Sequence, residues 1–149
     1  MKVKNYKLKI TKGGFTLLEL LIVIAIIGIL VAMGTVSYST AQKRARDSKR
    51  QGDMKAIQNA FEQYYAVNNG SYPGSCPLSG FTITIQPPDN TFNIPTDPKG
   101  SSNPYTRSNC SLSSYCYCAH LETAGQGNSG ADCNFTAETK DYFCVKNLQ

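Results

Sequence analysis

Glu19 is the residue with the most demanding chemistry, because it lies inside a long apolar run. Residues 15–36 (FTLLELLIVIAIIGILVAMGTV) hold one charged side chain, that of Glu19. A carboxylate placed in a membrane-spanning helix costs about 2.5 to 3.5 kcal/mol on insertion scales. The sequence therefore predicts either a cationic partner for Glu19 or a position near the membrane surface, where the carboxylate reaches water.

Two glycines, Gly13 and Gly14, directly precede this run, and Phe15 opens it. A residue without a Cβ lets the backbone be held extended in a protease cleft, so a cleavage site at Gly14 is one interpretation. A flexible joint is the other.

Six cysteines, none of them in the first 75 residues, form a second group with possible chemistry: Cys76, Cys110, Cys116, Cys118, Cys133 and Cys144. An even number in a small, loop-rich segment predicts three disulfides in an oxidising compartment. Reduced structural cysteines are the alternative. The sequence does not choose among the pairings, although the short spacing argues against a bridge between Cys116 and Cys118.

Two groups of side chains could supply metal ligands, but neither is sufficient to predict a metal site. Cys116, Cys118 and His120 would share one strand face, but their spacing lacks the Cys-x2-Cys pattern of structural zinc sites, so disulfides are preferred. Asp97, Ser101 and Ser102 supply oxygen ligands, but one carboxylate is too few to predict calcium. No cofactor is predicted, and with one histidine and no carboxylate cluster the head is not expected to be an enzyme.

The apolar run is the element that must position Glu19. Its 22 residues would form about 33 Å of helix, enough to cross a bilayer. The leader before it holds the basic residues Lys2, Lys4, Lys7, Lys9 and Lys12 and no acid, which favours a cytoplasmic leader. Without the leader, ten basic residues face ten acidic ones, so no specific nucleic-acid partner is predicted. An ordinary signal peptide cut after Ala32-Met33-Gly34 is an alternative, which would start the mature chain at Thr35.

The stretch KGGFTLLELLIVIAIIGIL, residues 12–30, resembles the signature of type IV prepilins and of type II secretion pseudopilins. The resemblance implies a prepilin peptidase that cleaves between Gly14 and Phe15 and methylates the new amine of Phe15. It further implies that Glu19 meets the Phe15 amine of a neighbouring subunit in a filament. An assembly platform with its ATPases and further copies of the chain are the other implied partners.

We therefore expect an α+β type IV pilin fold, in which a long N-terminal helix, transmembrane and then amphipathic, packs on a small antiparallel sheet with disulfide-closed loops. The expected parts are a leader (1–14), a transmembrane and polymerisation helix (15–36), its amphipathic continuation (37–69) and a disulfide-rich head (70–149). The resemblance also suggests a bridge between Cys133 and Cys144. The family's proline near Val36 is missing, which leaves open whether the helix breaks there.

Periodicity refines these parts. Apolar residues at helical spacing predict a stripe for docking the head, formed by Met54, Ile57, Phe61 and Tyr64 or Tyr65. Asn69-Gly70 predicts the end of the helix. Alternation predicts strands at residues 81–85, 114–122 and 141–146, the last two as antiparallel partners. The basic cluster at residues 43–50 is expected to be a solvated helix face, with the i,i+4 pairs Lys43 with Asp47 and Lys49 with Asp53.

The function expected from these features is that of a filament subunit. The chain would be a single-pass protein of the inner or cytoplasmic membrane before assembly and part of an extracellular pilus afterwards. Two alternatives remain: a type II secretion pseudopilin, which shares the N-terminal features, and a secreted disulfide-rich binding module.

Overall fold

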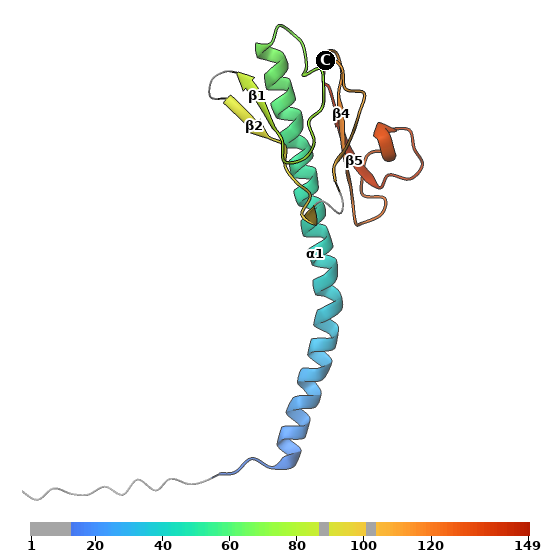
Figure 1. Ribbon diagram of the computed structural model, residues 1–149. Helices are drawn as coiled ribbons and strands as arrows, with labels where there is room; N and C mark the ends of the chain where they lie inside the picture. Colours follow the sequence, from blue (N-terminus) through green and yellow to red (C-terminus); the bar gives the residue numbers. More distant parts are fainter. Residues whose placement is uncertain (1–12, 87–89, 101–103) are drawn as a thin grey trace, which may run out of the picture. The chain divides into compact units, whose positions relative to one another are not determined.

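Figure 1 shows the computed structural model, which describes residues 13–86, 90–100 and 104–149. The chain forms two units, Met1–Ser39 and Thr40–Gln149, and one helix, α1 (Leu17–Val67), has residues in both. The leader lysines at positions 2 to 12 lie outside the described residues, as do Ser101 and Ser102.

In the first unit, α1 is apolar and its described side chains are exposed. Leu17 is 88% exposed, Leu21 63% and Ile29 63%, so the exposure continues along several turns. The helix continues through Gly28 and Gly34 without interruption. A helix that is apolar around its whole circumference needs lipid or other protein around it.

In the second unit, one face of α1 forms the floor of the head's core. Met54, Ile57 and Phe61 are fully buried, which confirms the predicted docking stripe. The helix ends at Val67, and Asn69 and Gly70 follow with φ angles of 53° and 70°. Two successive left-handed residues cannot continue a right-handed helix, so the predicted stop is confirmed.

The strands form two antiparallel sheets instead of one. A two-stranded sheet joins β1 (Thr82–Gln86) to β2 (Asn90–Asn93), and a three-stranded sheet has the order β3 (Thr106–Ser108), β4 (Cys116–His120), β5 (Tyr142–Lys146). The predicted pairing of residues 114–122 with 141–146 is confirmed by the β4–β5 ladder. The four-residue β2 and three-residue β3 were not predicted, because neither shows enough alternation to stand out.

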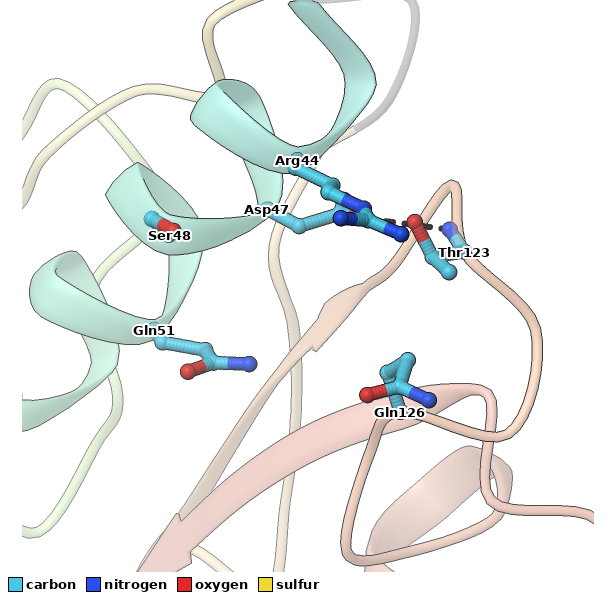
Figure 2. Close-up of a pocket in the computed structure, with 6 residues that line it drawn as sticks. All are labelled: Arg44, Asp47, Ser48, Gln51, Thr123 and Gln126. Carbon is cyan, nitrogen blue, oxygen red and sulfur yellow. Dashed lines mark hydrogen bonds between the residues drawn. The ribbon is translucent and has the colours of Figure 1, made fainter. Parts of the chain in front are cut away.

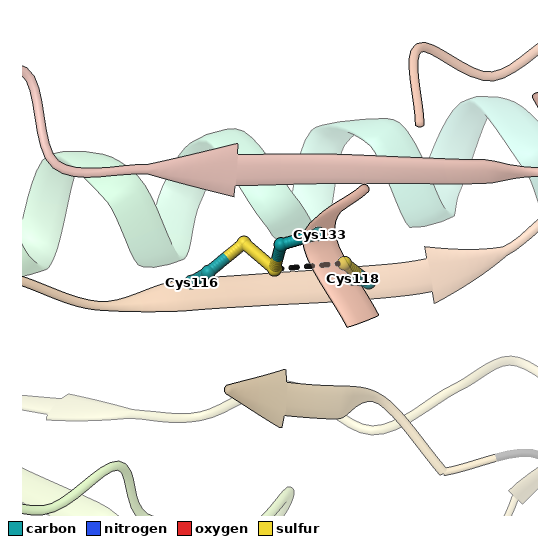
Figure 3. Close-up of side chains that lie close together, drawn as sticks. All are labelled: Cys116, Cys118 and Cys133. Atoms are coloured by element: carbon teal, nitrogen blue, oxygen red, sulfur yellow. Dashed lines mark hydrogen bonds between the residues drawn. A yellow bond between two sulfur atoms is a disulfide. The ribbon is translucent and has the colours of Figure 1, made fainter. Parts of the chain in front are cut away.

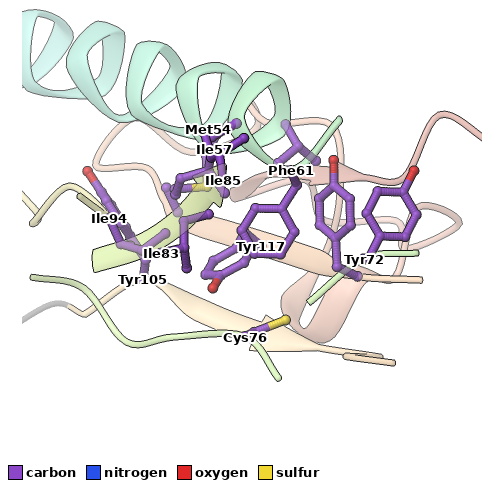
Figure 4. Close-up of a cluster of buried hydrophobic side chains, with 14 residues drawn as sticks. Met54, Ile57, Phe61, Tyr72, Cys76, Ile83, Ile85, Ile94, Tyr105 and Tyr117 are labelled. Carbon is purple, nitrogen blue, oxygen red and sulfur yellow. The ribbon is translucent and has the colours of Figure 1, made fainter. Parts of the chain in front are cut away.

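Alternation along β4 separates two buried clusters. Tyr115, just before the strand, packs on Phe61 of the helix stripe with ring centroids 4.5 Å apart. Tyr117 packs on the same ring with centroids 5.4 Å apart, and Figure 4 shows it beside Phe61. Cys116 and Cys118 alternate with these tyrosines and therefore point to the other face of the sheet. There they form a sulfur cluster with Cys144, against which Cys133 packs. Burial of each large apolar side chain contributes about 1.5 to 3 kcal/mol, so the helix stripe and β4 hold each other in place.

The disulfide pairing differs from the suggested one. The bridges join Cys76 to Cys110, Cys116 to Cys133 and Cys118 to Cys144, so the suggested bridge between Cys133 and Cys144 is wrong. The ladder places Cys118 directly opposite Cys144, and η2 (Ala131–Cys133) brings Cys133 to Cys116 (Figure 3). The bridge between Cys118 and Cys144 thus follows strand register, which the spacing of cysteines does not reveal.

Arg50 is the largest departure from the expected solvated helix face. Its side chain is 0% exposed and binds Asp97 at 2.6 Å, Asp47 at 2.8 Å and Glu122 at 2.9 Å. Arg46 binds Glu122 at 2.6 Å beside it, as does Lys99 at 2.8 Å. The cluster ties α1 to the loop before β3 and to the loop after β4.

The two predicted i,i+4 pairs on the solvated face are wrong for the same reason. Asp47 is buried and accepts from Arg50 and from the backbone N–H groups of Glu122 and Thr123. Asp53 accepts from the hydroxyl of Tyr105 at 2.6 Å. Both acids face the head, because a carboxylate with fixed donors in the protein is held better than one with a mobile lysine in water.

Replacing Arg50 with Met tests the weight of this cluster. Loss of the buried guanidinium leaves three carboxylates facing one another, and we expect about 3 to 5 kcal/mol of destabilisation. Thermal unfolding of the full chain in detergent micelles, followed by near-ultraviolet circular dichroism of the tyrosines, measures this loss. Lys49→Met, on the exposed neighbour, is the control and should change stability by less than about 0.5 kcal/mol. Equal effects of the two changes would contradict the assigned role of Arg50.

The same cluster predicts acid sensitivity of the head. The hydrogen bond from Arg46, with those from Lys99 and Arg50, lowers the pKa of Glu122 well below its ordinary 4.5, although partial burial opposes this. A carboxylate with a lowered pKa in the folded state stabilises the fold above its ordinary pKa and loses that contribution as pH falls. Unfolding free energy should therefore decline below about pH 4.5. Glu122→Gln should be less stable at neutral pH and should flatten this decline; an unchanged acid slope would refute the assignment.

Candidate functional site

The predicted cleavage segment lies outside the regular structure. Gly13 and Gly14 are exposed and precede the first turn of α1. A Cβ added at either glycine would have no atom within 4 Å among the described residues. The peptide bond between Gly14 and Phe15 is thus open to solvent in the subunit.

Thr16 and Glu19 form a reciprocal cap at the start of α1. The backbone N–H and the hydroxyl of Thr16 each donate to Oε2 of Glu19 at 2.9 Å. The N–H of Glu19 donates in return to the hydroxyl of Thr16 at 3.2 Å. This arrangement is a capping box, which satisfies donors that the first helical turn leaves unpaired.

The cap changes the expected chemistry of Glu19. The sequence predicted a cationic partner or water for the carboxylate of Glu19, whereas Thr16 of the same chain supplies two hydrogen-bond donors to it. Hydrogen bonds to a charged group contribute about 1.5 to 3 kcal/mol each at best, and these two offset part of the insertion cost without neutralising the charge. Thr16 was missed, although the spacing Thr-x-x-Glu before an apolar run is the signal that would have found it.

Around this cap, the surface is apolar. The exposed side chains of the first unit include Phe15, Leu17, Leu18, Leu20, Leu21, Ile22, Val23, Ile24, Ile26, Ile27, Ile29, Leu30, Val31 and Met33. By length and composition α1 is a candidate membrane span, and none of its most apolar window is buried within the structure. The site is therefore one acid held at the start of an apolar surface that the described part of the chain does not cover.

The head has a polar hollow of about 460 Å³ between α1 and the loop after β4 (Figure 2). It is lined by Arg44, Asp47, Ser48, Gln51, Thr123 and Gln126. The carboxylate of Asp47 is already bound by Arg50 and by the N–H of Thr123. Its hydrogen bonds are structural, so these six lining residues do not form a paired nucleophile and base.

At both candidate metal sites, ligand atoms of the described residues are engaged in other bonds. Sγ of Cys116, Cys118 and Cys133 lie within 4.8 Å of one another, but all three sulfurs are in disulfides. The ring of His120 packs edge-on against Tyr142 with centroids 4.9 Å apart, as an ordinary sheet residue. Both oxygens of Asp97 accept from Arg50, and one also accepts from the N–H of Lys99.

Comparison with known proteins bears on the N-terminal segment first. Residues 11–35 match the family described as the prokaryotic N-terminal methylation motif. This match contains Gly14, Phe15, Thr16 and Glu19. The match supports the resemblance of this N-terminal segment to those of type IV pilins and pseudopilins.

The pilin relatives come from several bacteria. The chain is 40% identical over 73 residues to a fimbrial protein of Neisseria meningitidis, which covers 49% of this chain and 42% of the relative. It is 38% identical over 82 residues to the type IV wide pilus major component PilA4 of Thermus thermophilus, covering 54% and 62%. These pilin matches span about half the length of the relatives.

A secretion protein matches over a longer stretch. The type II secretion system core protein G of Pseudomonas aeruginosa is 29% identical over 106 residues, covering 63% of this chain and 71% of the relative. No solved structure matches the pilin-like chain. The α+β pilin fold is supported by the chain's own structure, which has one long helix, small antiparallel sheets and three disulfides.

Thr16→Val tests the reciprocal cap. The substitution removes the hydroxyl from the capping box, and loss of an N-cap side chain costs about 1 kcal/mol. Amide hydrogen exchange in the first turn of α1, measured in micelles, should become about 5-fold faster. Thr35→Val is the matched control, since the hydroxyl of Thr35 donates to the Ala32 carbonyl inside the same helix. Unchanged exchange at the helix start in Thr16→Val would show that the cap does not hold it.

Proposed function

We propose that this protein is the structural subunit of a type IV pilus-like extracellular filament. One observation carries the proposal: a methylation motif coincides with an exposed apolar helical segment that has one acid near its start. Polymerisation gives this helix protein neighbours, which residues 13–86, 90–100 and 104–149 of its own chain do not provide. The pilins among the relatives support the same function.

Processing is the first step of the proposed function. A prepilin peptidase cleaves between Gly14 and Phe15 and methylates the amine of Phe15. The open, side-chain-free backbone at Gly13 and Gly14 supports access of a protease to this bond. Cleavage leaves Thr16 in place, so the helix cap survives in the mature chain.

Assembly then places a positive amine beside the acid. The mature Phe15 amine of one subunit pairs with Glu19 of a neighbour, and this pair neutralises a charge that Thr16 only hydrogen-bonds. Because a wrong axial shift leaves both charges unpaired in an apolar surrounding, the pair selects one register between subunits. An assembly platform and its ATPases move the subunits from the membrane into the fibre.

Location follows from the same steps. Before assembly, residues 15–36 cross the inner or cytoplasmic membrane once, with the leader in the cytoplasm. Afterwards, the helix lies in the filament and the head faces the outside. The three disulfides of the head suit an oxidising compartment.

A pseudopilin of type II secretion is the second candidate. It is favoured by the secretion protein G match, which covers 71% of that relative and extends beyond the N-terminal helix. Both candidates share cleavage, methylation and helix packing. They differ in whether the fibre is shed from the cell surface or stays short within a secretion apparatus.

Glu19→Ala tests the proposed function. The variant should still be processed to a chain that begins with methylated Phe15, because the cleaved bond precedes the helix. Its incorporation into fibres sheared from cells should fall at least about 10-fold, since the register-setting charge pair is gone. Mass spectrometry of the N-terminus and quantification of sheared fibres measure the two steps. Glu138→Ala, an exposed acid of the head, is the control.

Three outcomes would contradict the proposal. Wild-type protein that keeps its leader in working form would refute the processing step, and a start at Thr35 would instead indicate a secreted module. Normal amounts of fibre from Glu19→Ala would refute the role of the carboxylate in assembly.

A further inference from the structure

The head carries three sequences of the form Asn-x-Ser/Thr, beginning at Asn69, Asn109 and Asn134. In proteins exported from the cytoplasm, this tripeptide is the acceptor of N-linked glycans. A tripeptide is short enough to arise by chance. The surroundings of each asparagine therefore decide whether it is a site.

At Asn134 the structure brings both elements of the tripeptide together. The hydroxyl of Thr136 donates to Oδ1 of Asn134 at 2.9 Å, and the backbone N–H of Thr136 donates to the same atom at 3.2 Å. These bonds fix the carboxamide in an Asx turn. Within the described part of the chain Nδ2 of Asn134 makes no hydrogen bond, so the reacting nitrogen is free.

The residues on either side turn the carboxamide outward. Cys133 and Phe135 are half-buried and pack on the sulfur cluster of the head, whereas Asn134 and Thr136 are exposed. Cys133 is fixed by its disulfide to Cys116, and the amine of Lys146 lies 5.1 Å from the ring centre of Phe135. The loop thus anchors alternate residues and presents the amide and the hydroxyl on one face.

The other two tripeptides lack this arrangement. Asn69 lies in the left-handed turn that ends α1, and Ser71 behind it is half-buried. After Asn109, the hydroxyl of Ser111 is engaged with Ser113 and Ser114. Among the described contacts, neither hydroxyl reaches the carboxamide of its own asparagine.

We propose that Asn134 is an N-glycosylation site of the exported head. The donor is a glycan on a polyprenyl diphosphate carrier, and a membrane-bound oligosaccharyltransferase catalyses the transfer. Nδ2 of Asn134 forms a bond to the anomeric carbon of the first sugar, and the bond from that carbon to the diphosphate oxygen breaks. The carrier leaves as its diphosphate, and the proton from Nδ2 passes to a carboxylate base of the transferase.

This modification rests on one element of the proposed function, the location of the head outside the cytoplasm. It does not depend on polymerisation. A glycan on this loop would lie next to the disulfide cluster and would change which surfaces of the head a neighbour or receptor can contact.

The test is glycopeptide mass spectrometry of the full protein from the cells that make it. After reduction and alkylation, cleavage following glutamate isolates Asn134 in fragment 123–138, while Asn69 and Asn109 both fall in fragment 63–122. We expect a mass increase of linked sugars on fragment 123–138. Asn134→Gln and Thr136→Ala should both abolish it, and Thr136→Ser should retain it because the hydroxyl is kept. Ser71→Ala, which alters another tripeptide, is the control and should leave it unchanged.

The outcomes separate this proposal from the proposed function. Fragment 123–138 without sugar, in protein that begins at methylated Phe15, would overturn the glycosylation site and leave the filament function standing. Sugar that persists in Thr136→Ala, or that occurs only on fragment 63–122, would also overturn it. Sugar on fragment 123–138 in protein that retains its leader would support the site while contradicting the filament function.

Discussion

The carboxylate of Glu19 in the otherwise apolar stretch of residues 15–36 is the constraint on which the molecule's organisation depends. Its own chain holds this group with two hydrogen bonds from Thr16, and it makes no ion pair among the described residues. Such a group is tolerated at a membrane surface but has more to gain from a cation. The proposed filament supplies that cation from the new N-terminus of a neighbour. The carboxylate that raises the free energy of the single subunit in lipid then selects one register between the assembled subunits.

The head solves a different problem, because it is small and has many loops. Its core holds the second half of α1 against β4, with Phe61 packed on Tyr115 and Tyr117. Arg50 links two loops to the helix through ion pairs with three carboxylates. Disulfides from Cys76 to Cys110 and from Cys116 to Cys133 hold the remaining loops. These interactions keep the head folded whether lipid or other subunits surround the apolar half of the helix.

Local patterns predicted the long helix, its end at Asn69-Gly70 and the pairing of β4 with β5, since periodicity and turn residues act over a few positions. They failed where the outcome depends on partners distant in the chain. Arg50 was expected in water because its neighbours are basic, yet Asp97 and Glu122 lie 47 and 72 positions away. The bridge from Cys133 to Cys144 that the resemblance suggested is wrong, because strand register places Cys118 opposite Cys144. At the candidate site Gly14, Phe15 and Glu19 were marked from the sequence, but Thr16 was not, although its motif is local.

The pairing of Phe15 with Glu19 between subunits is tested most directly by the structure of the filament itself, determined by electron microscopy of fibres shed from cells. The account predicts that the methylated amine of each Phe15 lies within about 4 Å of a Glu19 carboxylate that belongs to another subunit. Filaments in which Glu19 contacts only Thr16 of its own chain, with the Phe15 amine directed elsewhere, would contradict it.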